Sequence, residues 1–97
     1  MANKLTPDQI QNELQSLAGW SLANEKLHKT FQFPDFAHAF GFMATAAIEI
    51  DKRNHHPEWL NVYNRVIVDL TTHDAGGITG KDIDLAKLLN QIAAKLQ

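Results

Sequence analysis

Apolar residues recur at helical spacing in three stretches of the chain. The first stretch opens with Thr6-Pro7-Asp8-Gln9, in which Thr6 can cap a helix, Pro7 suits its first turn and Gln9 completes a capping box. Gly19 suits the end of this helix. The apolar stripe of this stretch consists of Ile10, Leu14 and Leu17.

The second and third helical stretches are also marked by residues that suit helix ends and by apolar stripes. The second is predicted to begin at Pro34, with Asp35 in its first turn, and to end at Asn54 in a left-handed conformation. The third is predicted to begin after Thr79, with Asp82 completing a capping box. Their stripes are Phe36, Phe40, Met43, Ala47 and Ile50, then Ile83, Ala86, Leu89, Ile92, Ala93 and Leu96.

Alternating apolar and polar residues predict two β-hairpins between these helices. In residues 20–33, Leu22 is expected to pair with Leu27 across the turn Asn24-Glu25. In residues 59–72, pairing Val62 with Val66 keeps Leu60 and Val62 on the core face and leaves a three-residue loop at positions 63–65.

The resulting order is α-β-β-α-β-β-α. One-sided strands and one-sided helices predict an α+β fold, with a four-stranded antiparallel sheet and three helices packed on one face. A chain of 97 residues with 44% hydrophobic content predicts a single domain spanning residues 1–97. Oligomerisation would add stability to so short a chain.

Composition narrows the classes of function. The chain has no cysteine, which excludes disulfides and thiolate chemistry and suits a cytoplasmic protein. A net charge of −2 gives no indication of a nucleic-acid partner or a membrane surface. Residues 1–8 lack the apolar segment of a signal peptide, and the apolar run 36–50 is too short to span a bilayer.

The candidate chemistry lies in residues 51–73. His55 and His56 are adjacent and precede Pro57, which favours an extended conformation at a helix exit. His73 follows the second hairpin, which can return it beside this pair, so that three imidazoles surround one small ligand. The alternative interpretations are that His55 and His56 form a surface-exposed pair and that His73 has a structural role.

A zinc site is a further alternative for three histidines and an acid. Adjacent histidines in an extended segment point to opposite sides, and the spacing is unlike that of common zinc ligands, so we expect no metal.

The same segment carries a resemblance to a known family. The run Asp51 to Trp59 (Asp-Lys-Arg-Asn-His-His-Pro-Glu-Trp), followed by Asn61-Val-Tyr-Asn64 and Thr72-His-Asp74, resembles the pterin-4a-carbinolamine dehydratases. Gly41-Phe-Met43 and Asp82-Ile-Asp-Leu-Ala86 also match, so the resemblance covers nearly the whole chain.

The resemblance implies the fold derived above and dehydration of a 4a-hydroxytetrahydropterin to quinonoid dihydropterin, without a metal or cofactor. It implies His55 and His73 as acid/base residues and His56 as the residue that orients the substrate. Asp51 stands where the family has glutamate, which shortens its reach. The implied substrate-binding residues are Asp51, Asn54, Trp59, Thr72, Asp74 and Asp82.

Two of these residues have simpler interpretations. Asp82 also completes a capping box, and a core position is the commoner case for an aromatic residue such as Trp59. For the whole protein, the resemblance implies a homodimer or homotetramer with a pterin substrate. The alternative functions are a dimerisation cofactor of a transcription regulator, which binds a regulatory protein partner, and a metal-dependent hydrolase.

Overall fold

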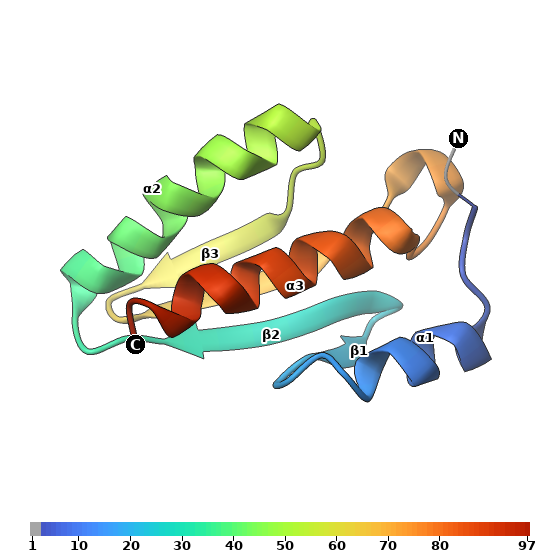
Figure 1. Cartoon of the computed structure of the whole chain (residues 1–97), viewed down its shortest axis with the longest axis horizontal. Helices are drawn as coiled ribbons and strands as arrows, with labels where there is room; N and C mark the ends of the chain where they lie inside the picture. The colour runs from blue at the N-terminus through green and yellow to red at the C-terminus, as the bar shows by residue number, and fades with distance from the viewer. Residues whose placement is uncertain (1–2) are drawn as a thin grey trace.

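A four-stranded antiparallel sheet in the order β1-β2-β4-β3 carries the helices on one face (Figure 1). The computed structural model describes residues 3–97, so the first two residues of the predicted domain lie outside the described part. The predicted α+β fold and element order are confirmed. The elements are α1 (Pro7–Leu14), β1 (Ser21–Ala23), β2 (Lys26–Gln32), α2 (Phe36–Arg53), β3 (Glu58–Val62), β4 (Arg65–Leu70), the short 3₁₀ helix η1 (His73–Ala75) and α3 (Gly80–Ala94).

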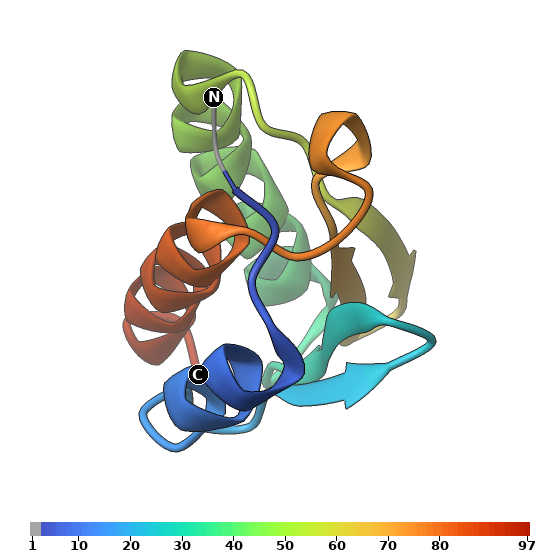
Figure 2. The ribbon, with the colours of Figure 1, turned by 90° about the vertical axis from the view of Figure 1, so that its right-hand side faces the viewer.

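The layers are clearest in the side view, where α2 and α3 lie on one side and the strands on the other (Figure 2). Aromatic rings join the layers, since the rings of Phe31 in β2 and Phe42 in α2 have centroids 4.9 Å apart. Within residues 3–97, no helix has the length and hydrophobicity needed to cross a membrane.

Both predicted capping boxes are present, but α1 is shorter than expected. The box of Thr6 with Gln9 begins α1, and that of Thr79 with Asp82 begins α3. The expected continuation of α1 to Gly19 is wrong, because the helix ends at Leu14 and the backbone then forms tighter i→i−3 turns through Leu17. Leu17 is nevertheless buried.

Helix α2 differs from prediction in its start and in its buried face. It begins at Phe36, and Asp35 is its N-cap, accepting a hydrogen bond from the His38 N–H at 2.8 Å, so the expected start at Pro34 is two residues early. The predicted stripe faces largely outward, since Phe36 and Phe40 are 50% and 57% exposed. The buried stripe consists of Ala39, Phe42, Ala46 and Ile50.

The first hairpin has the predicted register, with Leu22 opposite Leu27. The second does not, because Val62 pairs with Arg65 and the turn has two residues, 63 and 64. Tyr63 has φ 52°, and this left-handed conformation allows the shorter turn. Trp59 therefore shares the core face with Val68, while Leu60 and Val62 are exposed on the open face of the sheet.

Candidate active site

A cavity of about 230 Å³ lies between the end of α2, the η1 turn and the start of α3. These segments gather at one end of the molecule (Figures 1 and 2). All three candidate histidines contribute to its wall, although they are up to eighteen positions apart in the sequence. The lining residues are Asn54, His55, His56, Thr71, Thr72, His73, Asp74 and Lys81.

The exit from α2 turns the two adjacent histidines in different directions. Asn54 ends the helix in the left-handed conformation, with φ 51° and ψ 41°, as its sequence position predicted. The chain then runs extended through His55 and His56 toward β3. The side chain of His55 is only 12% exposed, whereas that of His56 is 57% exposed. One imidazole therefore faces the interior and the other faces solvent.

His55 is held by a carboxylate with no exposed surface. The Nε2 atom of His55 lies 2.6 Å from Oδ1 of Asp82, which is fully buried. The other carboxylate oxygen accepts hydrogen bonds from the Thr72 hydroxyl at 2.8 Å and the Thr79 N–H at 3.0 Å. Asp82 therefore lies behind His55 rather than on the cavity wall, and it ties the imidazole to the segment that leads to His73.

An ionised Asp82 accepts hydrogen bonds only, so its geometry assigns the Nε2 proton of His55. The Nδ1 atom is then the ring nitrogen left for proton exchange with a ligand. A buried carboxylate that fixes the tautomer and the ring orientation is a common support for a histidine in acid–base chemistry.

The other two imidazoles also face carboxylates, but at longer range and in solvent. His56 Nε2 lies 3.7 Å from Asp51 Oδ1, and His73 Nε2 lies 3.7 Å from Glu58 Oε2. The side chains of Asp51 and His73 are 89% and 81% exposed. Each of the three histidines therefore has its own carboxylate.

Glu58 was not predicted from the sequence as a site residue, and neither were Thr71 and Lys81. Glu58 directly follows Pro57 and opens β3, beside the strand that leads to His73. A hydrogen bond from Lys26 holds the pKa of Glu58 below its ordinary value, with smaller contributions from the charges of Lys26 and His73. The position of Glu58 after the histidine pair is the signal that would have found it.

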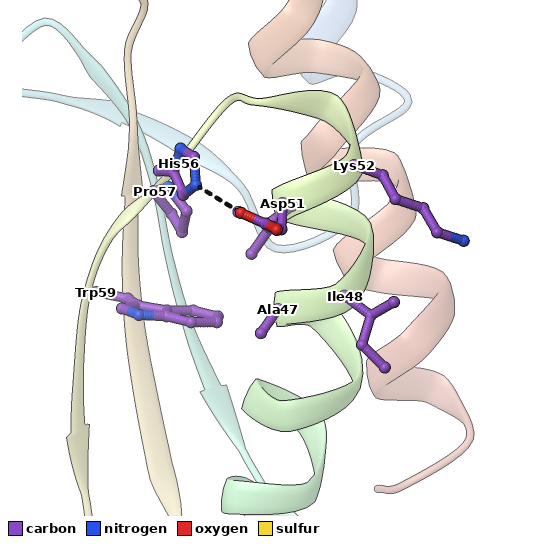
Figure 3. A pocket seen from close by; sticks show the side chains of 8 residues that line it. Ala47, Ile48, Asp51, Lys52, His56, Pro57 and Trp59 are labelled. Carbon is purple, nitrogen blue, oxygen red and sulfur yellow. Dashed lines mark ion pairs between the residues drawn. The ribbon is translucent and has the colours of Figure 1, made fainter.

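A larger cavity of about 650 Å³ adjoins the site between α2 and β3 (Figure 3). The Trp59 side chain reaches across it toward Ala47, and the Asp51–His56 pair lies at one end. His56 is the histidine that lines both cavities. Trp59 and Asp51, expected beside all three histidines, line the larger cavity, and only His56 of the three lies there with them.

In the part of the chain that the structure describes, no three or more His, Asp or Glu side chains form a group that could hold a metal ion.

Comparisons with known proteins point to one family. A family profile described as pterin 4 alpha carbinolamine dehydratase matches residues 3–92. A relative in Solibacter usitatus that carries the family's name is 54% identical over 94 residues, covering 97% of this chain and 99% of the relative. One in Rhodopseudomonas palustris is 53% identical, covering 99% of this chain and 97% of the relative.

A solved structure gives the same result at the level of the fold. The crystal structure of a protein described as a transcriptional coactivator/pterin dehydratase from Brucella melitensis has a TM-score of 0.91 and 46% identity, and the match covers 94% of this chain and 99% of that one. The sequence-based resemblance is confirmed, and with it the expected class of enzyme, a dehydratase. The chain belongs to the pterin-4-alpha-carbinolamine dehydratase family.

Proposed function

We propose that this protein removes water from a 4a-hydroxytetrahydropterin to give quinonoid dihydropterin, and that histidines carry the proton transfers. The observation that supports this most directly is the cavity in which His55, His56 and His73 meet. The reaction returns an oxidised pterin to a form that can be reduced again. A role in pterin recycling stays a prediction from the family, and a cytoplasmic location stays a prediction from the lack of cysteine.

The chemistry requires one acid and one base beside the pterin ring. The acid protonates the hydroxyl group on C4a, and the C4a–O bond breaks as the N5 lone pair forms a C4a–N5 double bond. The base takes the proton from N5, and water leaves. Atoms and charges balance without an oxidant or reductant. Histidine suits both steps because its two protonation states are accessible near neutral pH.

We assign the acid and base roles to His55 and His73, which reach the cavity from the α2 exit and from η1. His56, between the two cavities, orients the ring. Asp51, Asn54, Trp59 and Asp74 are proposed to contact the substrate. Two buried residues, Thr72 and Asp82, support the site instead, since both take part in the hydrogen-bond network behind His55.

Steady-state kinetics of three variants test these roles. His55→Ala and His73→Ala should each lower kcat, by up to ~10²–10⁴-fold for lost proton transfer, and the double variant should fall well below either. His56→Ala should raise KM more than it lowers kcat. The substrate is a synthetic 4a-carbinolamine followed by ultraviolet absorbance, and circular dichroism checks folding.

The same assay includes a chelator. Activity that survives chelation supports metal-free catalysis, whereas stoichiometric zinc lost together with activity would favour the hydrolase alternative. Folded His55→Ala and His73→Ala proteins that keep wild-type kcat would refute the assignment of acid and base.

A second candidate function is binding of a protein partner, alone or besides catalysis. It is favoured by the description of the Brucella melitensis protein as a coactivator and by exposed apolar side chains on α2, among them Phe36 and Phe40. The histidine variants separate the two functions, because partner binding through α2 would survive the loss of His55 or His73.

A further inference from the structure

Neighbouring cavities each share a histidine with the candidate active site. The larger cavity between α2 and β3 shares His56, a cavity of about 190 Å³ shares His55, and a cavity of about 250 Å³ shares His73. We infer that the cavity beside His73 is a subsite for the side chain on C6 of the pterin, and that Asn24 and Glu25 select side chains with hydroxyl groups. The inference rests on the proposed function, because it concerns the substrate of that reaction.

The structure of the substrate places this side chain beside the reacting atoms. In a tetrahydropterin, C4a and C6 are both bonded to N5, so a group on C6 leaves the ring next to the atoms that take part in the loss of water. The candidate active site has a volume of about 230 Å³, below the roughly 300–1,000 Å³ of typical small-molecule sites. It can hold two fused rings but has little room for a side chain, which therefore has to continue into an adjoining cavity.

The exposure of the histidines favours an exit past His73. His55 is almost buried and is tied to Asp82, so it forms a fixed wall, whereas His73 is largely exposed. Thr71 and His73 line both the candidate active site and the cavity beside it. The larger cavity shares only His56 with the candidate active site. A side chain that passes His73 therefore enters the subsite directly.

Polar side chains from a rigid turn line this subsite. Asn24 and Glu25 connect β1 to β2, and their left-handed conformations, with φ 51° and 62°, form a tight two-residue turn. Lys26, beside them, is held by Glu58 at 2.6 Å. Asn24, Glu25 and Thr71 have no such side-chain partner among the described residues, which leaves an amide, a carboxylate and a hydroxyl group available to a ligand.

This set of groups suits a neutral side chain with neighbouring hydroxyl groups. The two oxygens of the Glu25 carboxylate can accept hydrogen bonds from two hydroxyl groups, while the amide of Asn24 can both donate and accept. The other cavities suit different chemistry. Arg53 and Lys81 beside His55 would favour an anionic group, and the mainly apolar wall of the larger cavity would favour an apolar one.

The experiment compares two synthetic 4a-carbinolamines, one with a 1,2-dihydroxypropyl group on C6 and one with a methyl group. Wild-type protein should have the higher kcat/KM for the hydroxylated compound. Glu25→Gly should lower the ratio of the two kcat/KM values roughly 3–10-fold, the size of one or two hydrogen bonds at an exposed site. The loss should lie in KM rather than kcat, because Glu25 binds the side chain and not the reacting atoms.

The choice of glycine protects the turn. Asn-Gly is a favoured sequence for a tight hairpin turn with two left-handed residues, so Glu25→Gly removes the carboxylate without straining the backbone. Glu25→Gln keeps one acceptor oxygen and should retain part of the wild-type ratio. Circular dichroism checks the fold of both variants.

Variants of the competing cavities are the matched controls. Lys52→Gln alters the larger cavity and Arg53→Gln alters the cavity beside His55, and both should keep the wild-type ratio. The inference is overturned if the ratio follows Lys52 or Arg53 instead of Glu25, if Glu25→Gly keeps the wild-type ratio, or if wild-type protein does not prefer the hydroxylated compound. Wild-type protein that dehydrates neither compound would refute the proposed function, and the inference with it.

Discussion

Burial separates the three imidazole–carboxylate pairs of the site. Asp82 has no exposed surface, whereas Asp51 and Glu58 face solvent. Interactions between charges weaken in water and are screened by salt, so the exposed pairs at His56 and His73 are weak. The buried Asp82–His55 pair fixes the orientation of the His55 ring. His55 is therefore the histidine whose position depends most on its carboxylate.

We predict that Asp82→Asn lowers kcat markedly. In asparagine only the amide oxygen can accept hydrogen bonds, whereas both carboxylate oxygens of Asp82 accept them. The NH₂ group would therefore face either His55 or the Thr72 hydroxyl and the Thr79 N–H, which are donors themselves. The wrong ring orientation should cost roughly 10²–10⁴-fold in kcat, the range of lost proton transfer. An unpaired buried donor should also lower the free energy of unfolding by about 1–3 kcal/mol.

Asp84→Asn is the control for this change, since Asp84 lies on the same helix and is exposed. Its kcat and unfolding free energy should stay near those of the wild type. A folded Asp82→Asn enzyme with wild-type kcat would show that His55 needs no carboxylate behind it.

At the scale of residues, the sequence shows which histidines are unusual but not which side chains lie beside them. The His55-His56-Pro57 run and the position of His73 are local features that can be read directly. The partner of His73 depends on the register between β3 and β4, which the sequence pattern predicted wrongly. Glu58, which follows the histidine pair, was not among the predicted site residues. Asp82, implied as a substrate-binding residue, lies behind His55 instead.

At the scale of elements, the η1 segment holds His73 through a glycine in a left-handed conformation. Gly76 has φ 74°, and a methyl group there would meet no atom within 4 Å. We therefore predict that Gly76→Ala lowers the free energy of unfolding by roughly 1 kcal/mol through backbone strain alone.

Gly80 offers a matched comparison at the start of α3. A methyl group there also meets nothing within 4 Å, but its backbone is not left-handed. Gly80→Ala should raise the free energy of unfolding by about 0.4–1 kcal/mol, because alanine has less freedom in the unfolded chain. Urea denaturation measures both values. Equal destabilisation by the two substitutions would contradict the argument from backbone conformation.

The elements themselves were predictable where a local signal is strong. Both capping boxes and the turn between β1 and β2 follow from adjacent residues, and all three were confirmed. The buried face of α2 was not, because apolar residues cover two neighbouring faces and either satisfies helical periodicity. The structure buries the face with Phe42 and leaves the face with Phe40 outside.

At the scale of the whole molecule, the N-terminal part of the predicted α2 stripe, with Phe36 and Phe40, is exposed. The rings of Phe36 and Phe40 have centroids 5.9 Å apart and are each at least half exposed. Exposed apolar stripes of this kind are typical of interfaces. A chain of 97 residues also buries only about two-thirds of its unfolded surface, so association would add stability.

We therefore predict a homodimer or homotetramer that depends on this stripe. Wild-type protein at micromolar concentration should sediment as an oligomer, and Phe40→Gln should shift the mass toward the monomer and lower the unfolding midpoint. Thr45→Gln is the control, because Thr45 is exposed on α2 away from the stripe. The Phe40 side chain is 57% exposed, so its loss costs the isolated subunit little packing, and circular dichroism should show a preserved fold. A stable wild-type monomer, or an oligomer unaffected by Phe40→Gln, would mean that the stripe has another partner.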